Sequence, residues 1–346
     1  MAKGAYIGVD GLARPCWSGG ELTSFGTVTI SVGSTDSCAA TIGNKSLFRY
    51  KEDTVYYDEN LTEHSLSLEV ESNSKCTAVG GYFFLGGGTV ADAYAYDTDF
   101  TAHVIDDFAV ARYEMAVTSA GKYAMFSCGR KPARSEWSDT MDVYDSDTLT
   151  HTYFSMTSKA RSELAATSVG EYAMFGGGRT YNASDVSTSY TTVDVYDKDT
   201  LALVSGVEGL STSVFRLAAT TLGKCALFGG GSNAKSNSAI GTSTVNCYNK
   251  DTLTKTLLDD LFVGCENVSA TTVEDFALFA GGAERQTGSL VKTVTAYRAD
   301  TLTRITAPDL SVGKQKAPAT TLKNYALFGA AGTSTDQKKM DVYAVL

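Results

Sequence analysis

Charged side chains recur at one position of an internal repeat and could together form a polar site. The charged residues that precede successive strands rich in small residues are Arg112, Glu114, Arg161, Glu163, Arg216 and Lys316. If these strands converge, the side chains form a ring of both signs, which suits a polar or sugar-like ligand. A carboxylate pair such as Glu114 and Glu163 could also act on a glycoside. A solvated rim without a ligand is the third interpretation.

Long and dissimilar loops in the middle of the chain carry aromatic and polar side chains. The loops span residues 130–138, 179–190, 232–240 and 283–288, and they contain Arg134, Trp137, Tyr181, Tyr190 and Arg285. Rigid rings supply contact area and short polar groups supply hydrogen bonds, so this composition is typical of adaptable recognition surfaces. We expect these residues to bind a ligand, while tolerated surface variation would produce similar loops.

The histidines argue against metal or triad chemistry. There are three, and each lies six residues after an aspartate: Asp58 and His64, Asp97 and His103, Asp145 and His151. All three occupy the same position, on the expected outermost strand of three consecutive repeats. Such positions are too far apart to share a metal ion or to supply the base of a catalytic triad. We therefore expect structural roles for them, no metal site and no cofactor.

The elements that would position these residues belong to a repeat whose most regular copy spans residues 164–204. Its four short strands cover residues 164–169, 172–175, 192–196 and 201–204, named A to D here. The apolar anchors of strand B recur 37 to 53 residues apart, at Phe48, Leu85, Phe126, Phe175, Phe228, Phe279 and Phe328. Short strands with turn signals and no helical periodicity predict one antiparallel sheet per repeat. Seven sheets arranged radially form an all-β, seven-bladed β-propeller.

A diglycine ends strand B in several repeats, and a Tyr-Asp pair follows some residues later. The diglycines are Gly86-Gly87, Gly176-Gly177, Gly229-Gly230 and Gly281-Gly282, and the pairs lie at 96–97, 144–145 and 196–197. This pattern resembles the Kelch repeat and implies a Kelch-like β-propeller. The chain departs from that repeat in two ways. It lacks the tryptophan of the outer strand, and blades one, three and seven have other residues in place of the diglycine.

The last repeat ends after strand C, so its fourth strand must come from elsewhere. Residues 26–32 precede the first strand A in the place that residues 302–306 hold before the last one. We predict that 26–32 closes the ring as the outer strand of blade seven, since closure covers an open sheet edge. The chain then divides into an arm at 1–24 and a seven-bladed propeller at 25–346.

The arm has its own pattern. Asp10 and Gly11 lie between two short apolar runs, which predicts a hairpin with a two-residue type I′ turn. The segment resembles the start of many tail-associated proteins of phages and prophages of Gram-positive bacteria. That resemblance implies docking on a phage tail or baseplate protein. The docking residues would be Tyr6, Ile7, Asp10, Arg14 and Trp17.

The topology separates two faces. In an up-and-down sheet, A–B and C–D turns share one face, and B–C and D–A loops share the other. The A–B and C–D turns are short and alike, so we call their side the plain face, and the opposite side is the variable face. The arm should leave from the plain face, because strand D of blade seven begins there.

Composition excludes several classes of protein. The 346 residues carry a net charge of −10, which argues against general binding to nucleic acid. No run of about 18 apolar residues predicts membrane insertion, and the start has no signal-peptide pattern. The seven cysteines are an odd number without a CxxC pair, so we expect reduced packing residues.

These observations predict a non-enzymatic binding propeller. With the phage-like arm, we expect a receptor-binding or tail-fibre protein of a phage or phage-tail-like particle, located in the virion. Its ligand would be a bacterial surface glycan or protein. Two alternatives stay open: an intracellular, cytoplasmic Kelch-type scaffold that binds a protein, and a sugar-acting propeller enzyme.

Overall fold

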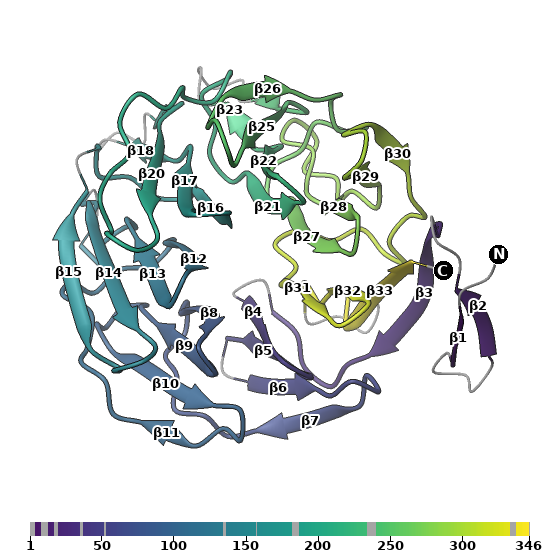
Figure 1. The fold of residues 1–346 in the computed structure, drawn as a ribbon, viewed down its shortest axis with the longest axis horizontal. Coiled ribbons are helices and arrows are strands. Elements are labelled where there is room, and N and C mark those ends of the chain that lie inside the picture. Colours follow the sequence, from purple (N-terminus) through teal and green to yellow (C-terminus); the bar gives the residue numbers. More distant parts are fainter. Residues whose placement is uncertain are drawn as a thin grey trace.

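The computed structural model confirms seven sheets arranged around a central opening (Figure 1). It describes residues 4–7, 13–16, 20–34, 37–51, 53–133, 136–156, 158–181, 187–233, 240–332 and 337–345. Within these ranges six blades have four strands, and blade four has three. The described residues form no helix, and hence none that could cross a membrane.

The same strand order recurs in each blade. The channel-lining A strands are β4 (Ser37–Ile42), β8 (Lys75–Val79), β12 (Ala116–Ala120), β16 (Ala165–Val169), β21 (Ala218–Leu222), β27 (Ser269–Val273) and β31 (Ala319–Leu322). The B strands are β5 (Lys45–Tyr50), β9 (Tyr82–Gly86), β13 (Tyr123–Ser127), β17 (Tyr172–Gly176), β22 (Cys225–Gly229), β28 (Phe276–Ala280) and β32 (Tyr325–Phe328).

The two outer positions follow in the same order. The C strands are β6 (Asp53–Tyr57), β10 (Ala93–Asp97), β14 (Thr140–Asp145), β20 (Val193–Asp197), β25 (Val245–Asn249), β29 (Val294–Arg298) and β33 (Lys339–Val345). The D strands are β7 (Glu63–Leu66), β11 (Ala102–His103), β15 (His151–Ser155), β26 (Lys255–Leu257), β30 (Arg304–Thr306) and, for blade seven, β3 (Leu22–Thr29). In blade four the expected strand D is reduced to one bridge, from Leu203 to Tyr196.

Hydrophobic packing joins each blade to the next. Seven clusters of buried residues occupy the seven interfaces between adjacent blades. Strand-B phenylalanines pack edge-on against strand-C tyrosines, for example Phe228 on Tyr248 with ring centroids 5.9 Å apart. Aromatic pairs favour this geometry because the positive ring edge meets the negative face. The six cysteines with described side chains are buried and free, as expected of packing residues.

The Tyr-Asp pair of strand C has a structural role. In the pairs at 96–97 and 144–145, the tyrosine hydroxyl donates a hydrogen bond to a main-chain carbonyl of the preceding D–A connection. Tyr96 donates to Glu69 and Tyr144 to Asp106, both at 3.0 Å. The aspartate accepts main-chain N–H groups of the C–D turn, as Asp97 does from residue 99 at 2.9 Å. The tyrosine thus joins its blade to the connection from the blade before, and the aspartate orders the turn that follows strand C.

The diglycine lies where a neighbouring blade comes closest. Gly177 has a φ of +74°, and a Cβ atom there would lie 2.7 Å from the carbonyl oxygen of Val214 in the next blade. The N–H of the adjacent Gly178 donates to that same oxygen at 2.8 Å. Both the backbone conformation and the space around it therefore require glycine.

We expect Gly177→Ala to lower the free energy of unfolding by about 3 kcal/mol or more, because left-handed strain adds to an overlap with backbone. Gly206 is a matched control, since its φ is +81° and nothing lies within 4 Å of a Cβ built there. Gly206→Ala should cost only about 1 kcal/mol. Urea denaturation measures both values, and equal losses would contradict the close approach between blades.

The predicted ring closure is confirmed, with shifted bounds. Strand β3 covers Leu22–Thr29 and pairs antiparallel with β33, whereas we expected residues 26–32. A register shift between Ser24 and Gly26 lets the pairing begin earlier, and Gly26 has the positive φ of +130°. Three residues that we assigned to the arm, 22–24, therefore belong to a strand of the ring.

The arm forms a hairpin that Figure 1 shows outside the ring, next to β3. Strands β1 (Gly4–Ile7) and β2 (Ala13–Cys16) pair antiparallel, with Tyr6 opposite Arg14. The last described pair is Ile7 and Ala13, and the expected turn at Asp10 and Gly11 lies outside the described residues. Asp10 and Trp17 lie outside the described residues, and docking by the arm stays a prediction.

Candidate functional site

Hydrogen bonds confirm the division into two faces. Isolated bridges join the D–A connections to the B–C loops, as between Ser162 and Arg179 or between Glu266 and Ala283. On the opposite side, the N–H of Ser146 in a C–D turn donates to Lys122 of an A–B turn at 2.9 Å. Corners and long loops therefore share the variable face, and the short turns form the plain face.

Six residues in the left-handed conformation surround the channel mouth on the variable face. They are Asn73, Glu114, Glu163, Arg216, Asn267 and Lys316, with φ between 54° and 62°. Main-chain bonds link several of them from blade to blade, such as Arg216 N–H to Glu163 at 2.8 Å and Lys316 N–H to Asn267 at 2.9 Å. All six line one hollow of about 360 Å³. The predicted position at the mouth is thus confirmed for Glu114, Glu163, Arg216 and Lys316, and ligand binding by them stays a prediction.

The placement of Arg112 and Arg161 at the mouth was wrong. Both side chains are 0% exposed and point back into their own blades. Arg161 donates to Gly177 at 2.7 Å, Lys159 at 3.1 Å and Asp194 at 2.6 Å. Arg112 binds Asp142 in the same way, and His151 contacts the other oxygen of that carboxylate at 2.7 Å. These arginines brace the corner that presents the following residues to the mouth.

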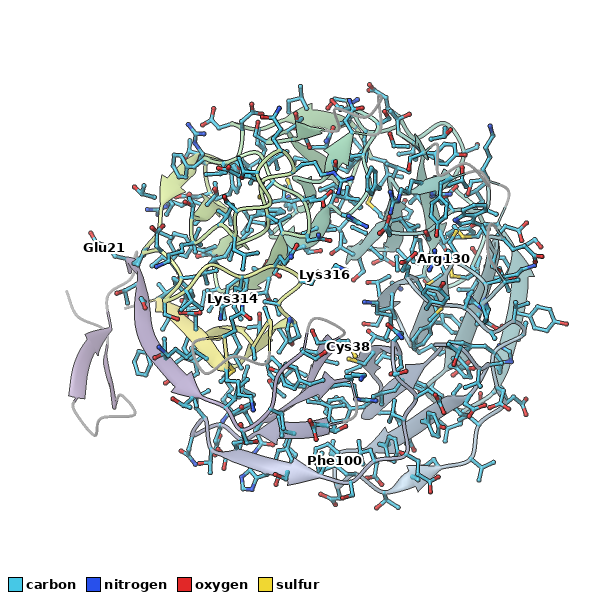
Figure 2. The ribbon with its side chains drawn as sticks, turned by 180° about the vertical axis from the view of Figure 1, so that it is seen from behind. Glu21, Cys38, Phe100, Arg130, Lys314 and Lys316 are labelled. Atoms are coloured by element: carbon cyan, nitrogen blue, oxygen red, sulfur yellow. The ribbon has the colours of Figure 1, made fainter. Side chains whose placement is uncertain are left out.

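In blade seven, Lys314 takes the position of these arginines and pairs with a buried aspartate. Figure 2 shows Lys316 beside the central opening and Lys314 farther out, within the blade. Lys314 is 1% exposed, and its Nζ lies 2.6 Å from Asp341. Burial lowers the pKa of Lys314, although the Asp341 charge opposes this effect. Lys316 is exposed and lines the hollow.

A chain of ion pairs runs along the mouth across blades four to six. Glu163 lies between Arg179 and Arg216, with Arg216 Nε 2.6 Å from its Oε1. Arg216 also reaches Glu266, where Nη1 and Oε1 are 3.0 Å apart. Arg285, a predicted ligand-binding residue, binds the same Glu266 oxygen at 3.1 Å. The carboxylates are nearly buried, so this network holds the guanidinium groups in fixed positions.

Two pKa shifts follow from this arrangement. Burial disfavours the charged form of Arg216, but Glu163 and Glu266 outweigh it and raise the pKa of Arg216. Burial and the neighbouring Glu163 charge raise the pKa of Glu114. Glu114 has a weak partner, since Arg130 Nε lies 3.8 Å from its Oε2. Arg216 is therefore held firmly in its charged form, whereas Glu114 is protonated more easily than an exposed glutamate.

Aromatic rings border the ion pairs on blades three and four. Trp137 meets Tyr181 edge-on, with ring centroids 5.0 Å apart. Arg130 lies over Tyr113 at 4.5 Å and over Tyr181 at 5.5 Å. The structure thus brings Trp137 and Tyr181 together, and both are half-buried.

The other predicted loop residues lie apart from this group or outside the described structure. The Tyr190 hydroxyl contacts the Thr180 hydroxyl at 2.9 Å, and Lys159 Nζ lies 5.8 Å from the Tyr190 ring centroid. Arg134 lies outside the described residues.

Sequence reasoning missed four site residues: Arg130, Arg179, Glu266 and Phe215, whose ring centroid lies 4.2 Å from the Arg179 guanidinium. Arg130 and Arg179 directly follow the glycine that ends strand B, and the bridges place this position at the mouth. Phe215 and Glu266 directly precede a left-handed residue and pair with the loop in the same way. The repeat pattern contained both signals, since each position recurs at a fixed offset from a feature that we had identified.

Comparisons with known proteins support the fold and leave the function open. No family model matches the chain, and no curated protein matches it. A solved structure described as "Structure of YjhT" aligns with a TM-score of 0.62 and 9% sequence identity, over 80% of this chain and 98% of that one. Identity this low shows the fold alone. Neither the Kelch resemblance nor the phage resemblance gains support from these comparisons, and the chain is established as a seven-bladed β-propeller.

Proposed function

We propose that the protein is a non-enzymatic binding propeller whose variable face takes a ligand on a bacterial surface. The observation that carries this proposal is the ordered network of arginines, glutamates and aromatic rings around one hollow. On the opposite face the described A–B and C–D turns are short, and the hollow at that end of the channel is lined by small and hydroxyl side chains without a charged group. A preformed polar site on one side of a rigid scaffold is what selective recognition needs, because little ordering remains to oppose binding.

The mixture of polar groups around the hollow favours a ligand rich in hydroxyl groups. Asn73 and Asn267 carry amides, Glu114 carries a carboxylate, Arg216 and Lys316 are cations, and all five line the hollow. They include donors, acceptors and amides that can be either. Sugar hydroxyls donate and accept, so a surface glycan can match all of these groups.

The state of Glu163 favours binding over glycoside chemistry. Arg216 and Arg179 each contact one of its two oxygens. A carboxylate held by two guanidinium groups is a poor nucleophile and a poor base, because both roles need an available lone pair. Only the raised pKa of Glu114 favours the enzyme alternative.

The arm extends the proposal to a particle of phage type. Strand β3 begins at Leu22, which pairs with Val345 at the plain-face end of strand C. The arm therefore joins the propeller opposite the variable face. A receptor-binding protein mounted through its arm on a tail or baseplate protein would then present the site outward. The alternative of a cytoplasmic protein-binding scaffold would use the same mouth without a cell-surface ligand.

The test is binding of the fluorescently labelled protein to intact Gram-positive cells from a panel of species. We expect saturable binding to some species, and its loss when residues 130–138 and 179–190 are replaced by Gly-Ser linkers of equal length. A variant lacking residues 1–19 is the matched control and should bind like the full chain, since the arm lies on the other side.

Three outcomes would contradict the proposal. Failure to bind any cell envelope would reject the function, and full binding by the loop variant would reject the site. Release of sugar from envelope polysaccharide, lost in Glu163→Gln, would show that the propeller is an enzyme.

A further inference from the structure

We infer that Arg130 forms a subsite for an anionic group of the ligand, the carboxylate or phosphate of an acidic sugar. The inference rests on the proposed function and adds the chemical class of the ligand. Figure 2 labels Arg130 on blade three and Lys316 beside the central opening.

The backbone and two rings hold Arg130 in one orientation. Its main chain exchanges hydrogen bonds with Tyr113 at 2.8 and 2.9 Å, and a second bridge joins it to Trp137. The guanidinium lies 4.5 Å from the Tyr113 ring centroid and 5.5 Å from that of Tyr181. Stacking on aromatic faces fixes the plane of the guanidinium, so little side-chain entropy is lost when a ligand binds.

The donors of Arg130 are not used within the described structure. Its side chain makes no hydrogen bond to any described residue, and its nearest carboxylate oxygen, in Glu114, is 3.8 Å away. The other three arginines of the site each donate to a neighbour, as Arg179 does to Ser187 at 3.2 Å and Arg285 to Glu266 at 3.1 Å. The side chain is 24% exposed and its Nε is buried, so the two Nη groups are the donors that a ligand can reach.

The donors of Arg130 can be paired only by a hydrogen-bond acceptor. A guanidinium donates hydrogen bonds and never accepts them. A carboxylate or a phosphate offers two acceptor oxygens that match the guanidinium fork. A neutral hydroxyl would fit one donor and leave the others unpaired.

The local charge also favours an anionic ligand group. The site contains Arg130, Arg179, Arg216 and Arg285, with Lys75 and Lys316 of the hollow, against Glu114, Glu163 and Glu266. Six positive and three negative charges leave a net +3. The whole chain has a net charge of −10. A positive mouth in an acidic protein concentrates anions at this point, because the low-dielectric walls focus its field.

The surroundings favour a sugar over an acidic peptide. An extended peptide binds by adding a strand to an open edge, which needs unpaired main-chain groups. At the corners these groups already bond between blades, as Glu163 N–H does to Glu114 at 3.1 Å and Asn267 N–H to Arg216 at 2.9 Å. Next to Arg130 the surface offers the Trp137 and Tyr181 rings, which suit the apolar face of a sugar ring.

Calorimetric titration of the full chain with three probes tests the inference. The probes are an oligogalacturonate, its neutral methyl ester, and an oligomer of glycerol phosphate. We expect at least one acidic probe to bind 10-fold or more tighter than the ester, with the two acidic arms distinguishing carboxylate from phosphate. Arg130→Ala should weaken that probe about 10- to 100-fold, as expected for loss of a charge-assisted pair.

Two further variants distinguish the effect of the planar guanidinium from the effects of its charge and of folding. Arg130→Lys keeps the charge but loses the planar fork, so it should bind nearly as weakly as Arg130→Ala while melting like the parent. Lys224→Ala removes one exposed cation from the plain face and should bind normally.

Several results would overturn the inference. They are equal binding of the ester, full affinity in Arg130→Lys, tighter binding of a poly-glutamate peptide than of either acidic probe, or no binding of any probe. If the protein still binds cells in any of these cases, the proposed function stands and only the anionic subsite fails.

Discussion

Deletion of residues 1–33 is expected to lower the melting temperature by about 10 °C or more, since several buried apolar side chains are lost together. The deletion removes β3, which pairs with β33 along seven residue pairs. It also removes Ile30, which is 2% exposed, and Phe25 and Val28, which pack on the cluster between blades seven and one. The open edge of β33 should in addition promote aggregation.

Deletion of residues 1–19 is the control for this result. That variant lacks the hairpin but keeps the whole of β3, so its melting temperature should match that of the full chain within about 2 °C. Differential scanning calorimetry or circular dichroism measures both variants. An unchanged melt after deletion of 1–33 would contradict closure of the ring by β3, whereas a large loss after deletion of 1–19 would give the hairpin a structural role.

The second large effect is expected at Arg161. Arg161→Ala should lower the free energy of unfolding by about 3–5 kcal/mol, because it leaves the Asp194 carboxylate buried without its charge partner. Urea denaturation measures the loss. The exposed Arg285→Ala should cost less than about 1 kcal/mol, since its pair with Glu266 is partly solvated. Similar costs for the two variants would contradict the bracing role of Arg161.

Blade five has an uncharged pair at the positions that Arg161 and Asp194 hold in blade four. The corresponding residues there are Val214 and Asn246, and the Asn246 side chain accepts the N–H of Ser211 at 2.9 Å. Blades that lack the basic residue thus also lack the aspartate. The double variant Arg161→Val with Asp194→Asn should therefore be more stable than Arg161→Val alone. If the second change brings no recovery, the two side chains do not act as a pair.

Much of the fold could be predicted because the same pattern of strands and turns recurs in seven repeats. The strand-B phenylalanines and short turns define each sheet, and a single missing strand at the C-terminus required closure from the N-terminus. The bounds of β3 were wrong because pairing continues through the irregularity between Ser24 and Gly26, which no repeat signal marks. Strand D of blade four is reduced to the bridge between Leu203 and Tyr196, and the structure gives no reason for this difference from the other blades.

The site was predicted less completely. Alignment placed Glu163 and Arg216 correctly at the mouth, yet it could not tell that Arg161, two residues before Glu163, turns inward. That direction depends on Asp194, which is 33 residues away in sequence and becomes a partner only in the folded blade. Loop composition gave Trp137 and Tyr181 but not Arg130, because contact between loops of different blades has no pattern along the chain.

Trp137 provides the most direct test that the variable face is the binding site. The chain has two tryptophans, Trp17 in the arm and Trp137 beside Tyr181. In Trp17→Phe, fluorescence comes from Trp137 alone, and in Trp137→Phe it comes from the arm. Each variant is titrated with purified cell-wall polysaccharide from a species that the protein binds. We predict a saturable emission change in Trp17→Phe with the same midpoint as calorimetric binding, and none in Trp137→Phe. Binding that leaves Trp137 emission unchanged, or alters only that of Trp17, would contradict the account.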